Sequence, residues 1–371
     1  MLLLSLVVFS FLPALLVMSY IIFTLVKWKH KINFQLPSGN YSEPVSIVIA
    51  AYNEEEYIFD KLDFLLSEEE WIPGSEVIVV SAGSTDKTNS ILEEFALDER
   101  VTLVIIKEHL TKPLALNRGV AISKNELIVF SDCRQTLSKG AVKVIVSFFV
   151  QPDIGAVNAT LSDTKYGGKT SLLRKISNII CLSESCKGSS LNLHGAFYAQ
   201  RKELFKPFPT HLIHDDLFSL VNTVAQKKRL IQTDKVLVFD VPLSSYYERT
   251  RIERLVKGLL SFATQHWNLI RQLSLPYKIR FLFYKYLKLF FPMFVLLGSV
   301  PLIYLVSAWI GWKMCLSLIL LPFILLGIHA KGRKFIALLF RIQLYFLVSL
   351  FCFVVLKKRE GYYQKLNVKP A

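Results

Sequence analysis

The stretch Val45-Ser-Ile-Val-Ile-Ala-Ala51, continued by Tyr52-Asn53-Glu54-Glu55, decides the fold class of this chain. A short run of β-branched and small apolar residues that ends in polar residues is typical of a buried strand. A helical pattern follows between Glu54 and Glu69. The apolar face expected for this helix carries Phe59, Leu62, Leu65 and Leu66. A buried strand that leads into an amphipathic helix predicts a βαβ unit.

The same alternation continues downstream. Further strands are expected at Glu76–Val80, Val101–Ile106 and Glu126–Phe130. The helices between them are expected from a cap near Ser84 through Ile91 to Phe95, and around Leu114–Ile122. The pattern predicts an α/β domain with a largely parallel sheet flanked by helices. Ligands bind such a sheet outside the carboxyl ends of its strands, so the segments after the strands are the candidate site.

Three polar segments follow the expected strands, at residues 51–55, 81–86 and 131–135. A nucleotide needs polar groups for its base and helix N-termini for its phosphates, which such segments can supply. The structural alternative is local: Asn53 and Glu54 cap the next helix, and Gly83 allows a turn before an N-cap at Ser84.

In this order, the motifs resemble those of the inverting family 2 glycosyltransferases in their membrane-anchored form. They are V-S-I-V-I-A-A-Y-N-E-E at Val45, G-S-T-D-K-T at Gly83, K-P-L-A-L-N-R-G at Lys112, F-S-D at Phe130, G-A-F-Y at Gly195 and H-D-D at His214. The resemblance runs from about Pro44 to Trp267. It implies a GT-A type nucleotide-sugar-binding fold and transfer with inversion at the anomeric carbon.

Two adjacent carboxylates, Asp215 and Asp216, are the candidate catalytic residues. Inverting transfer needs a base that takes the proton of the acceptor hydroxyl. By the resemblance, Asp216 stands where the family keeps this base, and it is preferred over Asp215. The structural alternative is that Asp215 only caps a helix that begins at Leu217.

The resemblance assigns eight residues to donor binding. They are Tyr52, Asn53, Glu54, Ser81, Lys112, Asn117, Asp132 and Arg134. The structural alternatives make Lys112 a surface lysine and Asn117 a turn residue. Where the family often has two acids that accept from uracil, this chain has Ser81-Ala82, so the resemblance does not identify the nucleotide.

The expected metal site departs from the family pattern. The usual D-x-D has two acids around a divalent cation, whereas this chain has Asp132-Cys133-Arg134. Asp132 remains the candidate metal ligand, but one carboxylate is a poor site for Mg²⁺ or Mn²⁺. One hypothesis is that Arg134 replaces part of the metal's role at the diphosphate. The alternative is that Arg134 pairs with Asp132 or a neighbouring acid.

Candidate acceptor residues lie further along the chain. By the resemblance, Phe197 and Tyr198 belong to an acceptor-side loop, although their segment also fits a buried strand. Processive family members carry Q-x-x-R-W with a tryptophan that stacks on the acceptor. Here Trp267 is kept, but Ala263 and His266 replace the glutamine and the arginine, which weakens the case for processive synthesis. An amphipathic, membrane-facing helix is the alternative for this segment.

The charge distribution indicates a membrane protein. The net charge is +15, yet residues 45–277 hold as many acidic as basic residues, so the surplus lies in apolar flanks. This placement argues against nucleic acid as a partner. Met1–Val26 and Leu289–Trp312 contain no charged residue, and about 20 apolar residues span a bilayer as a helix. Lysines and arginines border residues 45–277 on both sides, which predicts a cytoplasmic catalytic domain.

The expected domain boundaries follow from these patterns. They are an uncleaved transmembrane anchor at 1–26, a linker at 27–44, the glycosyltransferase domain at 45–276, an interfacial amphipathic helix at 277–288, about three transmembrane helices at 289–356 and a basic tail at 357–371. Three C-terminal spans would place the basic tail outside, against the orientation rule, so the span count stays open.

The leading functional hypothesis is an integral-membrane glycosyltransferase. It would move a sugar from a cytoplasmic nucleotide-sugar donor to a lipid-linked or growing glycan acceptor. One alternative is a processive polysaccharide synthase. Another is a catalytically inactive relative that serves as a subunit of a membrane complex with other envelope biosynthesis proteins.

Overall fold

The computed structural model of the protein describes residues 43–163, 172–240 and 245–314, with scattered positions between 12 and 26 and between 344 and 351. The chain divides into two compact units. We call Thr24–Pro242 with His266–Tyr277 the sheet unit, and Met1–Phe23, Leu243–Gln265 and Lys278–Ala371 the helical unit.

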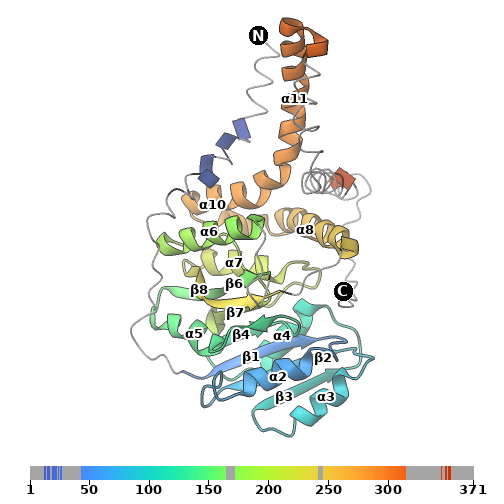
Figure 1. Cartoon of the computed structure of the whole chain (residues 1–371). Coiled ribbons are helices and arrows are strands. Elements are labelled where there is room, and N and C mark those ends of the chain that lie inside the picture. The colour runs from blue at the N-terminus through green and yellow to red at the C-terminus, as the bar shows by residue number, and fades with distance from the viewer. Residues whose placement is uncertain are drawn as a thin grey trace. The chain divides into compact units, whose positions relative to one another are not determined.

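A single mixed sheet organises the sheet unit (Figure 1). Its strands lie in the order β3-β2-β1-β4-β7-β6-β8-β5. Their bounds are β1 (Val45–Ala51), β2 (Glu76–Ala82), β3 (Val101–Ile106), β4 (Leu127–Ser131), β5 (Thr136–Leu137), β6 (Ile154–Ser162), β7 (Phe197–Arg201) and β8 (Arg229–Phe239). The expected strands at Val45–Ala51 and Val101–Ile106 have the observed bounds, and the other two expected strands differ from theirs by at most two residues at either end.

The sheet is less parallel than predicted. β1 is parallel to β2 and β4, β2 to β3, and β6 to β8. However, β7 is antiparallel to both β4 and β6, and β5 is antiparallel to β8. The α/β class is thus confirmed, with a mixed sheet as the correction.

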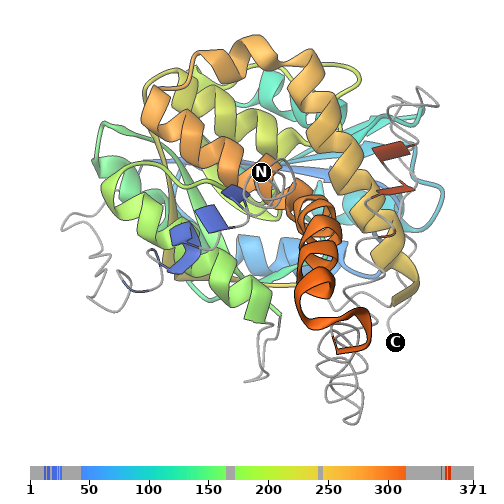
Figure 2. The same ribbon diagram turned by 90° about the horizontal axis from the view of Figure 1, so that it is seen from above.

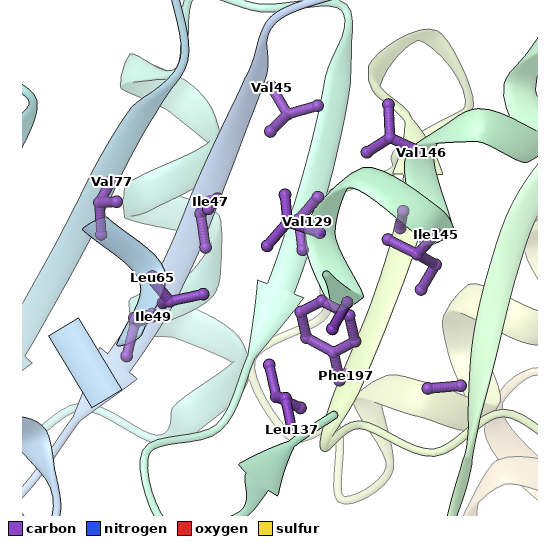
Figure 3. Packing of buried hydrophobic residues seen from close by; sticks show 14 of the residues in the cluster. Val45, Ile47, Ile49, Leu65, Val77, Val129, Leu137, Ile145, Val146 and Phe197 are labelled. Atoms are coloured by element: carbon purple, nitrogen blue, oxygen red, sulfur yellow. The ribbon is translucent and has the colours of Figure 1, made fainter. Parts of the chain in front are cut away.

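Helices cover both faces of this sheet. The helices of the sheet unit and its border are α2 (Ile58–Leu66), α3 (Thr88–Phe95), α4 (Lys112–Ile122), α5 (Ala141–Ser147), α6 (Leu172–Lys187), α7 (Asp215–Ala225), α9 (Trp267–Arg271) and α10 (Leu275–Leu282), with short 3₁₀ turns at Phe148–Val150 and Lys202–Leu204. On one face, Leu65 of α2 and Ile145 of α5 pack against Ile47, Val129 and other inward side chains (Figure 3).

Helix α4 lies on the opposite face, and a glycine sets its distance from the sheet. A Cβ atom at Gly119 would lie 2.4 Å from a methyl group of Val48 and 3.4 Å from one of Val80. Only glycine therefore allows α4 to approach β1 and β2 this closely. This close packing places Lys112, the first residue of α4, at the edge of the sheet.

Two details of the predicted helices are wrong. The helix expected from Glu54 begins only at Ile58, and its buried face carries Lys61 instead of Phe59, which is 52% exposed. The helix expected to be capped by Ser84 begins at Thr88, whose backbone N–H is accepted by the side chain of Asp86 at 3.0 Å. Both helices begin later than expected because the turns that precede them are hydrogen-bonded to each other.

The helical unit contains α8 (Ser245–Gln265), a π-helical turn at Phe283–Leu287 and α11 (Lys288–Ile310). Both helices are drawn in shades of orange and gold (Figure 2). Within the part of the chain that the structure describes, no helix has the length and the hydropathy required to cross a membrane. Helical structure is present at the expected interfacial segment 277–288. Most of the anchor and linker, the later C-terminal spans and the basic tail lie outside the described residues.

Candidate functional site

The polar segments predicted as the site meet at one edge of the sheet. The carboxyl ends of β1, β2, β3 and β4 share this edge because these strands are parallel. The start of β7 lies there too, since β7 runs antiparallel to β4. The backbone N–H of Asp132, just after β4, donates to the carbonyl of Ala196, just before β7, at 2.9 Å. The reversal of β7 therefore brings Gly195-Ala196 against the expected donor-binding loop.

The turns after β1 and β2 are hydrogen-bonded to each other. The backbone N–H of Asn53 donates to Ser84 Oγ at 3.1 Å, and the backbone N–H of Thr85 donates to Asn53 Oδ1 at 2.7 Å. The backbone N–H of Glu54 donates to Thr88 Oγ1 at 2.7 Å. Asn53 has a φ of 52°, a left-handed conformation that asparagine tolerates better than most residues. These contacts give the polar side chains a structural role in joining the two turns.

Ser81 belongs to the same network but lies inside it. Its side chain is buried; its hydroxyl donates to Asn89 Oδ1 at 2.6 Å and is 2.9 Å from Ser84 Oγ. Its expected donor contact remains a prediction, and in this structure the hydroxyl is used to hold the turn after β2.

Tyr52 lies beside a residue that the motifs did not single out. Its ring centroid is 4.4 Å from that of His109, and the two ring planes are tilted by 58°. The approach is possible because Gly83 has no side chain: a Cβ there would lie 2.9 Å from the backbone nitrogen of His109. The turn after β3 thus joins those after β1 and β2, and supplies an exposed aromatic ring beside Tyr52.

The loop after β4, residues 132–135, is held by several elements. Asp132 accepts a hydrogen bond from Lys112 of α4 at 2.5 Å. Gln135 donates through Nε2 to Asp240, after β8, at 3.3 Å, and its carbonyl accepts from Lys61 Nζ of α2 at 2.5 Å. The conformation of this loop therefore depends on segments that are far apart in the sequence.

Arg134 pairs with a neighbouring acid. Its Nε atom is 3.2 and 3.3 Å from the two carboxylate oxygens of Glu54, and both side chains are largely buried. The alternative interpretation of Arg134, pairing with a neighbouring acid, is therefore the one that the geometry favours. The pair also gives Glu54 a role in joining the loops after β1 and β4.

We call Lys112, Asp132 and Asp215 the charged centre. The Lys112 ammonium lies 2.5 Å from Asp132 Oδ1 and 3.6 Å from Asp215 Oδ2. Gly195 lies next to it: a Cβ there would be 3.2 Å from Lys112 Nζ and 3.7 Å from Asp215 Oδ2. The Lys112 side chain is 27% exposed, so the charged centre is not fully enclosed.

Asp215 and Asp216 form the first turn of α7, where the helix dipole favours negative charge. The Asp215 side chain is 10% exposed, and among the described residues its Oδ2 atom accepts no hydrogen bond. The Asp216 side chain is 31% exposed; its Oδ1 accepts from the backbone N–H of Leu217 at 2.7 Å and lies 3.9 Å from His214 Nδ1. The alternative in which Asp215 only caps a helix beginning at Leu217 does not hold, because α7 begins at Asp215 and contains both acids. Asp216 is the more accessible of the two.

Phe197 and Tyr198 lie in the core. Both are fully buried in β7, so the buried-strand alternative is confirmed and neither side chain is exposed to solvent. The Tyr198 hydroxyl is 3.2 Å from Ser219 Oγ. Burial, and next the charge of Asp215, raise the pKa of Tyr198 well above its usual value, so this phenol stays protonated beneath the charged centre.

Asn117 and Trp267 have contrasting surroundings. The Asn117 side-chain amide donates to the carbonyl of Phe208 at 2.9 Å and accepts from its backbone N–H at 2.8 Å. This pairing joins α4 to the backbone at Phe208. Asn117 lies within α4, so it is not a turn residue, and its expected contact with the donor remains a prediction. Trp267 is the first residue of α9 and is 44% exposed, so its role in stacking on an acceptor remains a prediction.

Sequence reasoning missed Gly195 as a contact of the charged centre, His109 beside Tyr52, and Lys61 beneath the loop after β4. Gly195 carries no signal beyond its place in the G-A-F-Y motif, and nothing in the sequence around His109 marks that residue as part of the site. Lys61 did carry a signal, because it shares helical spacing with the buried residues Ile58, Leu62 and Leu65. Lysine is rarely buried unless it is paired, so a lysine on the apolar face of a helix indicates a buried partner for its charge.

The residues at Asp132 do not fit a resident divalent cation. Such a cation needs several oxygen ligands, and within the described residues no three His, Cys, Asp or Glu side chains are grouped suitably. The ammonium of Lys112 also lies against the Asp132 carboxylate, where a cation would bind. Arg134, in the second position of the motif, is paired with Glu54.

Comparison with known proteins agrees with this arrangement. Residues 46–219 match the family described as Glycosyl transferase family 2. Over 187 residues the chain is 29% identical to the poly-beta-1,6-N-acetyl-D-glucosamine synthase of Staphylococcus epidermidis, an alignment that covers 47% of this chain and 44% of that protein. Over 117 residues it is 25% identical to the glycosyltransferase GlyG of Streptococcus pneumoniae, covering 31% and 38% of the two chains. The alignments thus span less than half the length of these relatives.

Among solved structures, the mannosyltransferase PcManGT of Pyrobaculum calidifontis, in complex with GDP-Man and Mn²⁺, superposes with a TM-score of 0.74. The superposition covers 96% of this chain and 99% of that one, at 22% sequence identity, and shows that the fold is shared. Together with the relatives, the family match identifies residues 46–219 as a glycosyltransferase domain of family 2.

Proposed function

We propose that the chain is a membrane-anchored enzyme that transfers a sugar, with inversion, from a cytoplasmic nucleotide-sugar donor to a lipid-linked or growing glycan acceptor. The single observation that carries this proposal is the position of Asp216. Its partly exposed carboxylate lies at the start of α7, and its Cβ is 3.8 Å from the Cβ position of Gly195, beside the charged centre.

The chemistry assigned to Asp216 is that of a general base. The acceptor hydroxyl oxygen attacks the anomeric carbon, and its proton passes to the Asp216 carboxylate. The bond between the anomeric carbon and the phosphate oxygen breaks, and its electron pair leaves with the nucleoside diphosphate. Asp215 is less suited to take the proton, because it is more buried and faces the Lys112 ammonium.

Lys112 is assigned to the leaving group. Its ammonium lies 3.6 Å from Asp215 Oδ2, and a positive charge there stabilises the negative charge that develops on the diphosphate. Asp132 holds this ammonium in position at 2.5 Å. We assign Arg134 to the structural pair with Glu54, not to the diphosphate.

The donor base is assigned to the turns after β1 and β3. Tyr52 and His109 supply two neighbouring rings, on which a nucleobase can stack. A protein of similar fold supports a nucleotide-sugar donor, since PcManGT was solved with GDP-Man. Its name does not decide which nucleotide this chain uses.

The central experiment is the Asp216→Asn substitution in the full-length protein, purified in detergent. Turnover is measured with UDP-GlcNAc and GDP-mannose as donors and a membrane lipid extract as acceptor source. The proposal expects turnover to fall by at least about 100-fold, since a general base contributes about 10²–10⁴ in rate, while donor binding persists. The Asp63→Asn variant, which changes an exposed acid on α2, serves as the matched control and should retain full turnover.

The outcome also separates this proposal from the inactive-subunit alternative. If Asp216→Asn lowers neither turnover in vitro nor glycan output in the host, while the protein stays folded, the enzymatic assignment of Asp216 fails. Retention of an acid at each of Asp132, Asp215 and Asp216 argues against an inactive scaffold.

A processive synthase remains the second candidate, because one similar protein is named as a polysaccharide synthase. Chromatography of the product separates the two: single-sugar addition supports our proposal, and a long polymer supports processive synthesis. The incomplete Q-x-x-R-W motif at Trp267 favours single transfer.

The membrane assignment rests on the charge-free runs and their basic borders. Protease protection of the chain in sealed inner-membrane vesicles tests it. We expect residues 45–276 to be cleaved only from the cytoplasmic face, and release of the intact chain by high salt or carbonate would contradict an integral anchor.

A further inference from the structure

A buried lysine lies beneath the loop that carries Asp132 and Arg134. Lys61, on α2, is only 4% exposed. Its neighbours on the same helix face are Ile58, Leu62 and Leu65, which belong to the apolar core. No part of the mechanism proposed above uses this side chain.

The Lys61 ammonium donates to the backbone carbonyl of Gln135 at 2.5 Å. The titratable groups that act on it, Asp132 and Cys133, come from the same loop after β4. Burial lowers the pKa of Lys61 to about 8, and the two neighbours oppose that change. The side chain therefore still carries its charge at neutral pH.

The segment around Lys61 holds two successive positions of that loop. Glu54, in the turn that precedes α2, binds Arg134, and Lys61, within α2, binds Gln135. The next contact of the loop is the hydrogen bond from Gln135 to Asp240. Arg134 and Gln135 follow Asp132 in the loop, and the segment from Glu54 to Lys61 binds both of them. The position of Asp132, which holds the Lys112 ammonium, thus depends on these contacts.

Stability alone does not account for a lysine at this place. Burying an ammonium group is costly, and an apolar residue of similar volume is often neutral or stabilising in its place. A loop carbonyl near the protein surface can also bond to water without a buried cation. A charged donor on a core helix is better explained by a need to fix the loop in one conformation.

We infer that Lys61 is a positioning residue for donor binding, which fixes the loop 132–135 so that Asp132 and Lys112 meet the nucleotide diphosphate. This inference rests on the proposed function. It assigns Lys61 no contact with the substrate, because the side chain acts through the Gln135 carbonyl and the field at Asp132.

The test compares Lys61→Met with Leu65→Met in the full-length, detergent-purified protein. Both variants place a methionine on the buried face of α2, but only the first removes the cation. UDP and GDP are the probes, and their affinities are measured by calorimetric titration beside the thermal midpoint. We expect Lys61→Met to weaken nucleotide binding by about 10-fold with an unchanged or higher midpoint, and Leu65→Met to bind as wild type does.

Saturating donor supplies a second readout. A positioning role in donor binding predicts that KM for the donor rises while kcat changes by less than about 3-fold. Wild-type affinity in Lys61→Met overturns the inference and leaves the proposed function intact. If the wild-type protein binds no nucleoside diphosphate, neither UDP or GDP nor ADP, CDP or dTDP, the proposed function fails, and the inference falls with it.

The pH dependence keeps the test decisive should Lys61→Met fail to fold. Lys61 loses its charge as the pH rises through about 8, so the nucleotide affinity of the wild type should fall severalfold between about pH 7 and pH 9.5. A wild-type affinity that stays constant over this range overturns the inference. In a folded Lys61→Met protein, this decline should be smaller than in the wild type.

Discussion

Two neighbouring regions at the same edge of the sheet use their polar groups differently. In the joined turns after β1 and β2, each of the backbone N–H groups of Asn53, Glu54 and Thr85 has a side-chain oxygen as its partner. In the charged centre, one ammonium serves two carboxylates, and among the described residues Asp215 Oδ2 accepts no hydrogen bond.

The difference distinguishes polar groups that stabilise the fold from charged groups that remain able to bind a ligand. Neutral groups whose hydrogen bonds are satisfied stabilise a fold and have little left to offer a ligand. Buried or half-buried charges that are incompletely satisfied are costly, and they are found where a ligand completes them. We therefore expect changes in the joined turns to lower stability, and changes in the charged centre to lower activity.

Among changes within these two regions, the largest effect is expected for Lys112→Met. Removal of the ammonium leaves Asp132 and Asp215 facing each other and takes away the charge assigned to the leaving group. We expect kcat/KM to fall by about 10²–10³, the size found when one preorganised donor is removed. The matched control is Arg118→Met, which removes an exposed cation from the same helix. Equal losses in both variants would indicate a general effect of charge.

A smaller effect is expected for Gly195→Ala. The new methyl group would lie 3.2 Å from Lys112 Nζ, so the flexible end of the lysine must move by a few tenths of an ångström. We expect kcat/KM to fall by about 10-fold with little change in the thermal midpoint, since misplacing a catalytic group is costly in rate.

The control for this change is Gly188→Ala. A Cβ at Gly188 meets only the Glu184 carbonyl, at an ordinary 3.8 Å. It should leave turnover unchanged. A Gly195→Ala enzyme with wild-type kinetics would show that the close approach of Gly195 to the charged centre is not needed for activity.

The joined turns should respond in stability. Asn53→Ala removes the acceptor of the Thr85 N–H and places alanine at a φ of 52°. We expect the unfolding free energy to fall by about 2 kcal/mol, and by about 1 kcal/mol in Asn53→Gly, which restores only the backbone freedom. Thermal unfolding measures both. A large loss of donor affinity in folded Asn53→Gly would instead favour the predicted donor contact of Asn53.

The smallest effect is expected from metal removal. Because the residues around Asp132 do not fit a divalent cation, turnover in EDTA should stay within about 2-fold of the untreated enzyme. Complete loss of activity that Mn²⁺ restores would contradict this prediction. It would show that Lys112 leaves Asp132 when the donor binds, and that the charged centre binds a metal ion during turnover.

Much of this site was predictable because it follows from strand order. Tyr52, Asn53 and Glu54 after β1, Ser81 near the end of β2, and Asp132 after β4 all lie at the carboxyl edge where the strand pattern placed them. The partner of each side chain was not predictable. Whether Arg134 pairs with Glu54 or with a ligand depends on the distance between two loops, and local sequence does not contain that distance.

The sequence by itself determined β1 to β4, the presence of the helices between them and the motif order, because β-branched runs, apolar periodicity and turn residues act through near neighbours along the chain. Tertiary structure decided the rest. The antiparallel entry of β7 buried Phe197 and Tyr198 and brought Gly195 to Lys112, and the rotation of α2 buried Lys61 and exposed Phe59. These outcomes depend on which faces of distant elements pack together, and a charge acquires its role only from the charges that such packing brings within a few ångströms.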